Sequence, residues 1–232
     1  MLEILKKNLD SIKFRIDKAA QKVGKSIDDI ILVGVSKTQP IEKIERVYEY
    51  GLRCFGENKV QEAIEKMDKL APLDIKWHFI GHLQTNKINK VLGKFELIHS
   101  VDSLHLAEEL NKKSLKRELV TNILIEVNTS GEESKFGFEP ETLIDVFADF
   151  EKFKNLKILG LMTVALYSDN ESEVRKCFIT LRELFENLKK YNSDNIEMKY
   201  LSMGMSHDFE IAIEEGANIV RIGTAIFGER VY

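Results

Sequence analysis

A lysine follows the first strongly apolar stretch of the sequence. Residues 30–35 comprise five apolar residues and one glycine, and Ser36 and Lys37 come directly after them. A continuous apolar run of this kind is typical of a strand that is buried on both faces. Where a lysine at such a strand end faces an apolar cavity, desolvation lowers the pKa of its amine, and a neutral amine attacks aldehydes and ketones. Lys37 is therefore a candidate for Schiff-base chemistry; the alternative is an ordinary solvated lysine.

Two turns near the end of the sequence carry the residues of an anion site. Residues 201–208 include Gly204 and Ser206, and we expect a helix to begin at Ser206; residues 221–228 include Gly223 and Thr224. Backbone N–H groups at helix starts favour anions, and small residues let a phosphate approach closely. The alternative is that Ser206 only caps a helix and Gly223 only forms a tight turn. A phosphorylated aldehyde, such as pyridoxal 5′-phosphate (PLP), would use Lys37 and this anion site together.

The elements that must position these residues alternate between short apolar runs and helical patterns. The strand candidates are residues 30–36, 53–58, 76–81, 96–102, 122–128, 157–165, 198–204 and 218–228. Eight such units in a chain of this length predict a (β/α)8 barrel. The rival is a doubly wound open sheet, which usually has a glycine-rich phosphate loop after its first strand. Ser36, Lys37 and Thr38 occupy that position here.

In such a barrel the strand ends form the functional face, so polar residues there are site candidates. The predicted strands lead to Lys37, Glu57, Asn58, His78, His99, Asp102, Asn128, Thr163, Ser202, Arg221 and Thr224. His78 and His82 are four residues apart, but they fall on a strand and a turn, which disfavours a helical metal pair. We predict no metal site. Lys135 is a candidate for neutralising a ligand from across the barrel mouth.

The amino-terminal segment, residues 1–24, is predicted to be an amphipathic helix that packs on the barrel. Its apolar positions recur in steps of three and four: Leu2, Leu5, Leu9, Ile12, Ile16, Ala19 and Val23. A short coiled coil would show the same pattern. A second helical face is formed by Val174, Cys177, Phe178, Leu181, Leu184, Phe185 and Leu188. Because no Pro/Gly/Ser-rich linker interrupts the sequence, we expect one domain over residues 1–232.

The composition of the sequence argues against nucleic acid and membranes as binding partners. The 232 residues carry a formal net charge of -4, which does not suit a nucleic-acid-binding surface. No apolar run reaches the roughly 18 residues of a membrane span, and the first residues are charged throughout. The two cysteines, Cys54 and Cys177, lack metal-ligand or disulfide-framework spacing. We therefore expect a cytoplasmic protein that binds neither nucleic acid nor membrane.

Several segments in one order resemble the pyridoxal phosphate homeostasis proteins, small single-domain relatives of alanine racemase. They are VGVSKTQP, CFGENKVQE, WHFIGHLQTNK, IHSVDS, VNTSGEESKFGF, GLMT and LSMGMSHDFEIAIEEGANIVRIGTAIFG. The resemblance covers residues 30–228 and implies a fold-type III PLP-binding barrel. It assigns Lys37 to the covalent aldimine with PLP and Arg221 to the pyridine nitrogen. It assigns Ser206, Gly223 and Thr224 to the phosphate, with Ser202 as the alternative to Ser206, and it places Asn58 and Met203 along the cofactor.

The resemblance implies a role in vitamin B6 homeostasis with little or no catalysis. PLP acts as an electron sink when its ring nitrogen is protonated, whereas Arg221 can only donate to that nitrogen. Alanine racemase shares the arginine but also uses a tyrosine base from a second domain and partner subunit; Tyr232, at the end of the chain, is a poor substitute. The alternatives are a PLP-dependent amino-acid racemase and a cofactor-free Schiff-base aldolase.

The expected partners follow from this role. They are PLP itself and, transiently, PLP-dependent apoenzymes. We expect the basic residues Lys87, Lys90 and Lys94 to form a solvated helix face; the alternative is a docking surface for such an apoenzyme. Without a second domain, we expect a monomer.

Overall fold

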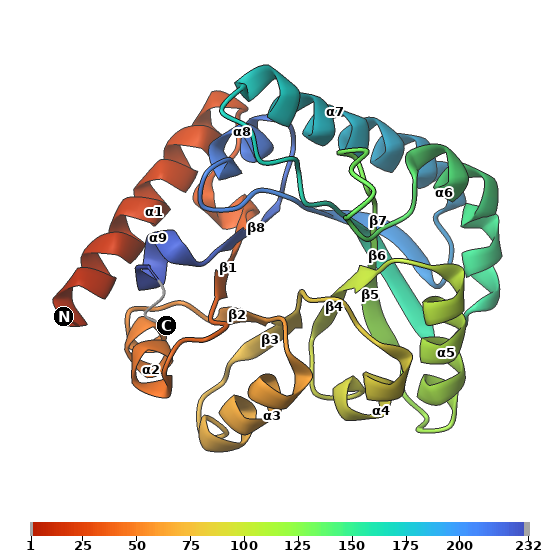
Figure 1. The fold of residues 1–232 in the computed structure, drawn as a ribbon, viewed down its shortest axis with the longest axis horizontal. Coiled ribbons are helices and arrows are strands. Elements are labelled where there is room, and N and C mark those ends of the chain that lie inside the picture. The colour runs from red at the N-terminus through yellow and green to blue at the C-terminus, as the bar shows by residue number, and fades with distance from the viewer. Residues whose placement is uncertain (1, 230–232) are drawn as a thin grey trace.

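Eight parallel strands form a closed barrel in the computed structural model, which describes residues 2–229 (Figure 1). The strands are β1 (Ile31–Val35), β2 (Cys54–Glu57), β3 (Lys76–Phe79), β4 (Leu97–Val101), β5 (Thr121–Glu126), β6 (Leu156–Met162), β7 (Ile196–Ser202) and β8 (Ile219–Ile222). Each strand pairs with the next, and β8 pairs with β1. Every strand overlaps a predicted apolar run, so the barrel prediction is confirmed and the open sheet is wrong.

Helices surround the barrel between successive strands (Figure 1). They are α1 (Leu2–Lys22), α2 (Ile41–Glu49), α3 (Val60–Lys69), α4 (Ile88–Val91), α5 (Leu104–Leu115), α6 (Pro140–Val146), α7 (Glu171–Leu188), α8 (Phe209–Glu214) and α9 (Thr224–Phe227). Short 3₁₀ helices occupy Ile27–Asp29, Thr85–Lys87, Phe147–Lys152 and Lys189–Tyr191. All seven residues of the predicted α7 face are buried. A fully apolar stripe of this width is what a helix needs to cover a sheet.

The amino-terminal helix α1 lies on its own barrel, beside α8 and α9 (Figure 1). Its predicted apolar face is buried at Leu5, Leu9, Ile12, Ile16 and Ala19. Val23 is 39% exposed, so its prediction as a face residue was wrong. The reason is local: α1 ends at Lys22, and Gly24 then adopts the left-handed conformation that stops a helix. The side chain of Leu2 lies outside the described residues.

Two polar contacts fasten α1 to the last turns of the fold. The side chain of Asn8 donates to the carbonyl of Ile226 in α9 at 3.0 Å. Arg15 donates to both carboxylate oxygens of Glu210 in α8, at 2.8 and 2.6 Å. A packed intramolecular role for α1 therefore replaces the coiled-coil alternative.

The limits of the domain stay a prediction, because Met1 and residues 230–232 lie outside the described part. Tyr232, considered above as a base, belongs to that segment. Within residues 2–229, no helix combines the length and apolar character that a bilayer crossing requires.

Candidate functional site

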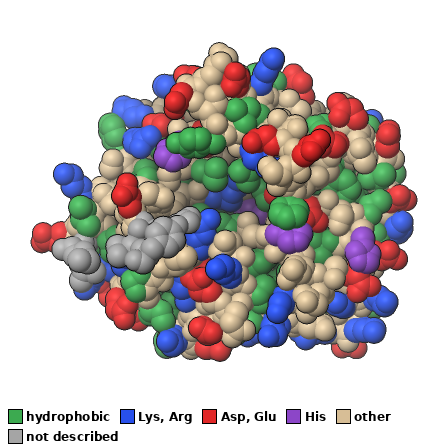
Figure 2. All heavy atoms as spheres, in the orientation of Figure 1, with side chains coloured by type: hydrophobic (Ala, Val, Ile, Leu, Met, Phe, Trp, Pro, Cys, Tyr) green, Lys and Arg blue, Asp and Glu red, His purple; other side chains and the backbone are tan. Residues whose placement is uncertain are grey.

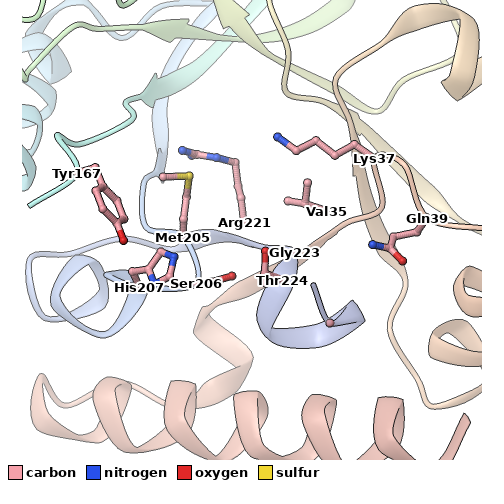
Figure 3. A pocket seen from close by; sticks show the side chains of 11 residues that line it. Val35, Lys37, Gln39, Tyr167, Met205, Ser206, His207, Arg221, Gly223 and Thr224 are labelled. Atoms are coloured by element: carbon pink, nitrogen blue, oxygen red, sulfur yellow. The ribbon is translucent and has the colours of Figure 1, made fainter. Parts of the chain in front are cut away.

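A cavity of about 240 Å³ opens where β1, β7 and β8 end (Figure 3). It is lined by Val35, Lys37, Gln39, Tyr167, Met205, Ser206, His207, Arg221, Gly223, Thr224 and Gly228. The space-filling view shows this face of the molecule hollowed near its centre, with basic side chains in the hollow and histidines near its margin (Figure 2). The carboxyl ends of these strands thus surround a cavity, on the face where the sequence analysis placed the site candidates.

Lys37 extends into this cavity from the end of β1 (Figure 3). Along the strand, side chains point alternately inward and outward, so Val33, Val35 and Lys37 share the inner side. Val33 is fully buried inside the barrel, and Lys37 itself is half-buried at the mouth. The strand therefore delivers a long amine from an apolar interior to the cavity.

Arg221 enters the cavity from β8 and is 5% exposed. Its guanidinium donates to the hydroxyl of Ser202 at 2.6 Å and to the carbonyl of Thr163 at 2.8 Å. Burial lowers the pKa of Arg221 to about 10, while the charges of Asp208 and Glu126 act in the opposite direction. The side chain is still a cation at neutral pH, and its two bonds fix its plane.

Behind Arg221, a chain of hydrogen bonds crosses the interior of the barrel. The hydroxyl of Ser202 lies 2.9 Å from Nδ1 of His99, and Nε2 of His99 lies 2.9 Å from Nδ1 of His78. Because a guanidinium can only donate, Ser202 accepts from Arg221 and is left to donate its own proton to His99. That choice puts the proton of His99 on Nε2, facing His78. The chain thus has one direction, from Arg221 to His78.

Both imidazoles of this chain are neutral, as the direction of the chain requires. Burial lowers the pKa of His78 to about 4, and burial together with the nearby charges of His78 and Arg221 lowers the pKa of His99 well below its ordinary value. A neutral imidazole has one donor and one acceptor nitrogen, which is what each position in the chain uses. The chain holds the Ser202 hydroxyl, and through it Arg221, in one orientation.

The hydroxyls of Ser206 and Thr224 lie on the α9 side of the cavity (Figure 3). The N–H of Ala225 donates to the hydroxyl of Ser206 at 3.4 Å, which joins the two turns. Helix α8 begins at Phe209, so the predicted start at Ser206 was wrong. Asp208 takes the N-cap position, and its carboxylate accepts from the N–H of Met205 at 2.5 Å. Ser206 therefore does not cap α8, and its side chain lines the cavity.

Gly204 makes this turn possible. Its φ is +95°, and a Cβ atom there would lie 2.6 Å from Cβ of Ala212 and 2.9 Å from Cα of Phe209. Only glycine combines that backbone conformation with so close an approach. The turn between β7 and α8 is therefore pressed against its own helix, which sets the position of Ser206.

The structure brings five of the seven predicted cofactor residues into one cavity: Lys37, Ser206, Arg221, Gly223 and Thr224. The other two lie elsewhere. Met203 is fully buried, and Asn58 lines a separate hollow with Lys59 and His82. The roles of Asn58 and Met203 stay predictions.

Ser202, the alternative to Ser206 for the phosphate, is fully buried within the hydrogen-bonded chain. Its hydroxyl already has two partners, Arg221 and His99. The geometry favours Ser206 for a ligand contact.

Three further candidate site residues, His82, Asp102 and Lys135, form contacts outside the cavity of Lys37. His82 lies 3.0 Å from a carboxylate oxygen of Asp102, and no cluster of three potential metal ligands occurs within residues 2–229. The ammonium of Lys135 donates to the carbonyl of Ala165 at 3.0 Å and pairs with Glu132. Lys135 does not line the cavity of Lys37.

Several cavity residues were not singled out from the sequence. Met205 and His207 flank Ser206, so the quoted segment contained them without assigning them a role. Tyr167 comes from the loop after β6 and is 84% exposed; its ring lies edge-on to His207, with 5.7 Å between centroids. No periodicity or spacing connects Tyr167 to the two glycine turns, and only the closed barrel brings it there.

The carboxyl of Glu126, at the barrel mouth, was also not singled out from the sequence. Burial, aided by the charge of Asp102, raises the pKa of Glu126 to about 7, although Arg221 opposes the shift. Glu126 is the last residue of β5. It points inward because it is two residues from Leu124, which packs inside the barrel. It is therefore a group that titrates near neutral pH close to Arg221.

A barrel of this kind, with a lysine after β1 and an arginine on β8, belongs to a known class. The family model described as alanine racemase, N-terminal domain, matches residues 8–231. A solved alanine racemase of Clostridium difficile has a TM-score of 0.78 at 15% identity, covering 98% of this chain and 60% of that chain, which shows the shared fold alone.

More similar proteins narrow the class. The pyridoxal phosphate homeostasis protein of Aquifex aeolicus is 49% identical over 224 residues, 97% of each chain. PipY of Synechococcus elongatus, solved with PLP bound, is 32% identical with a TM-score of 0.84, and covers 97% of this chain and 100% of that one. The chain belongs to the family of pyridoxal phosphate homeostasis proteins.

Proposed function

We propose that this protein binds PLP as a Schiff base on Lys37 and holds it for vitamin B6 homeostasis, with little or no turnover. One observation carries the proposal: the amine of Lys37 and the hydroxyls of Ser206 and Thr224 line the same cavity. An aldehyde and a phosphate on one small molecule use these two sides at once. The PLP bound by the similar PipY supports the same ligand.

The residues present fit this ligand chemically. The amine of Lys37 adds to the aldehyde carbon, and loss of one water molecule leaves a C=N bond. The hydroxyls of Ser206 and Thr224 donate to phosphate oxygens, in bonds strengthened by the charge of the phosphate. Gly223 precedes Thr224 in the cavity lining, and a Cβ there would come within 3.3 Å of Val35, a tight contact that would require Val35 to shift.

Arg221 explains why binding need not lead to catalysis. Bound PLP supplies an electron sink whose strength depends on a protonated ring nitrogen. In the proposed arrangement, Arg221 faces that nitrogen, and as a buried cation it donates a hydrogen bond but no proton. The bonds from Arg221 to Ser202 and Thr163 keep the guanidinium in this place. The ring nitrogen then stays unprotonated, which weakens carbanion stabilisation.

The experiment combines the visible spectrum of the purified protein with intact mass after borohydride reduction. We expect a yellow protein, loss of its visible band on reduction, and a mass increase that maps to Lys37. The Lys37→Ala variant should lose the adduct but retain weak phosphate-dependent binding, whereas Lys154→Ala, at an exposed lysine, should behave as wild type. An adduct that maps to another lysine would move the site.

The same preparation separates the alternatives. A colourless protein that binds a sugar phosphate would favour the cofactor-free aldolase. Racemisation of L-alanine that scales with protein concentration and disappears in Lys37→Ala would establish the racemase.

We further propose that the protein acts in the cytoplasm as a monomer that passes PLP to apoenzymes transiently. The cavity opens to solvent at the barrel face (Figure 2), which suits a carrier. Mixing the loaded protein with a PLP-dependent apoenzyme and following the recovery of that enzyme's activity tests the transfer.

A further inference from the structure

A buried lysine of α3, Lys66, has all three of its protons occupied. Its ammonium donates to the carbonyl of Ser36 at 2.7 Å, to Oε1 of Glu57 at 2.7 Å and to Oε1 of Glu62 at 2.6 Å. Lys66 is 6% exposed, although lysine is among the residues least often buried. An ammonium with three acceptors at these distances is held in a single position.

This cluster holds both peptide groups that flank Lys37. On one side, the carbonyl of Ser36 accepts from Lys66. On the other, the N–H of Thr38 donates to the same oxygen of Glu62 that Lys66 contacts, at 2.6 Å. The backbone at Lys37 is thus fixed immediately before and immediately after the residue.

The backbone held in this way is strained. Thr38 has a φ of +62°, in the left-handed region that β-branched residues rarely adopt. Such a conformation persists where surrounding contacts impose it, and it is concentrated at functional sites. The bond from Thr38 to Glu62 is a contact that imposes it here.

The cluster lies on the outer side of the strand end, opposite to the cavity. The hydroxyl of Ser36 points outward and donates to Oε1 of Glu57 at 2.6 Å, whereas Lys37 lines the cavity on the inside. Because consecutive side chains near a strand end point in opposite directions, holding Ser36 outward directs Lys37 inward.

Glu57 makes the cluster sensitive to the loss of Lys66. Its side chain is fully buried, and its Oε2 atom has no hydrogen-bond partner among the described residues. Burial raises the pKa of Glu57, and the charge of Lys66 is the largest opposing influence. A buried carboxylate that loses its cation is left uncompensated.

We propose that Lys66, acting with Glu57 and Glu62, is a positioning residue that aims the amine of Lys37 at the aldehyde of the ligand. The proposal rests on the proposed function, because it concerns the aldehyde side of the same cavity. The phosphate side, Ser206 and Thr224, belongs to the turns after β7 and β8, whereas the cluster of Lys66 lies between the ends of β1 and β2 and helix α3. Loss of Lys66 should therefore impair capture of the aldehyde and leave the phosphate contacts unchanged.

The test compares two ligands, PLP and pyridoxine 5′-phosphate, which carries an alcohol in place of the aldehyde. For Lys66→Met we expect the affinity for PLP to fall at least about tenfold, since a preorganised nucleophile is lost. The affinity for pyridoxine 5′-phosphate should change less than about twofold, since its phosphate contacts remain. The borohydride-fixed adduct should form correspondingly more slowly.

Further variants keep the test decisive if Lys66→Met folds poorly. The double variant Lys66→Met with Glu57→Gln removes the negative charge that Lys66→Met alone would leave uncompensated. It still releases the carbonyl of Ser36 from its bond to Lys66. Glu62→Ala releases Thr38, whereas Glu62→Gln keeps an acceptor oxygen there and should restore PLP capture. Lys69→Met changes an exposed lysine on the same helix and serves as the matched control.

The outcomes separate the two proposals. A wild-type protein with no preference for the aldehyde ligand contradicts the proposed function and the positioning role with it. A wild-type protein that forms the adduct, together with folded Lys66 and Glu62 variants that form it equally fast, overturns the positioning role alone. Equal losses for both ligands also overturn it, because they indicate a general structural defect.

Discussion

Lys37 and Arg221 bring an amine and a guanidinium to one cavity, and the surroundings of Arg221 make its buried charge tenable. Arg221 distributes its donors over Ser202 and Thr163, and the carboxyls of Asp208 and Glu126 oppose the loss of its charge. A buried cation in the lining of the cavity favours a ligand that carries negative charge. In our proposal, the cavity selects a molecule that carries both negative charge and an electrophile.

The phosphate side of the site gives the first prediction at this scale. Thr224→Ala or Ser206→Ala should each weaken PLP retention by roughly 1–3 kcal/mol, the range for a hydrogen bond to a charged group. Dissociation of PLP, followed by dialysis and absorbance, measures the effect. Ser11→Ala, at an exposed position of α1, is the control. Unchanged dissociation in both variants would place the phosphate elsewhere.

Glu126 gives a prediction about pH. Its pKa is raised to about 7 in the folded protein, so between about pH 4.5 and 7 the folded state keeps a proton that the unfolded state has lost. Stability contributed by this group therefore falls as pH rises through that window, and the group has no effect below it. Glu126→Gln should raise the free energy of unfolding by at most about 3 kcal/mol above pH 7.

Urea unfolding of the ligand-free protein at pH 4.5 and pH 8 measures this difference. The Glu126→Gln variant and wild type should converge at the lower pH and separate at the higher one. Glu133→Gln, at an exposed glutamate, should follow wild type at both values. A constant difference at both values would exclude titration of Glu126 as the cause.

At the scale of elements, the sequence predicted the strands better than the helix boundaries. Strands such as β1 and β5 are covered on both faces, so their residues form continuous apolar runs that are visible without tertiary information. The start of α8 was misplaced because Ser206 and Asp208 are both good capping residues, and only the bond from Met205 to Asp208 decides between them.

The residues of the candidate site also fall into two groups: those that a local sequence pattern indicates and those that only the fold brings together. Lys37 and Thr224 follow strongly apolar strands and Arg221 lies near the end of one, so the sequence offered all three as candidates. The chain through His99 and His78 joins β8 to β3 across the barrel, and no local pattern encodes it. The contact of Lys66 with Ser36 likewise depends on how α3 packs, thirty residues along the chain.

Helix α1 gives the prediction that belongs to elements. It braces α8 and α9, which follow the two turns of the phosphate side, through Asn8 and Arg15. Leu9 is fully buried beneath this brace, so Leu9→Ala should cost about 2–5 kcal/mol of stability. Arg15→Ala, which removes a partly exposed ion pair, should cost about 1 kcal/mol or less. Urea denaturation compares the two; equal costs would contradict packing as the main contribution of α1.

At the scale of the whole molecule, the large apolar side chains left on the surface are scattered. Among the described residues they are Ile4, Phe14, Val23, Leu115, Val120, Phe136, Ile144 and Tyr167. They come from α1 and the turn after it, the end of α5, the loop before β5, α6 and two further loops. Stable homodimers usually bury a contiguous patch with an apolar centre, and single exposed apolar residues do not form one.

This distribution predicts a monomer in solution, with a cavity complete within one chain. Sedimentation velocity over about a hundredfold range of concentration should give one unchanging species, because a dimer held by scattered contacts would dissociate on dilution. Phe14→Ser, on the outer face of α1, should leave the sedimentation coefficient unchanged. A tight dimer in which a partner closes the mouth beside Lys37 would contradict this expectation. Since such a partner could bring a further base beside Lys37, that result would revive the racemase as a function of this barrel.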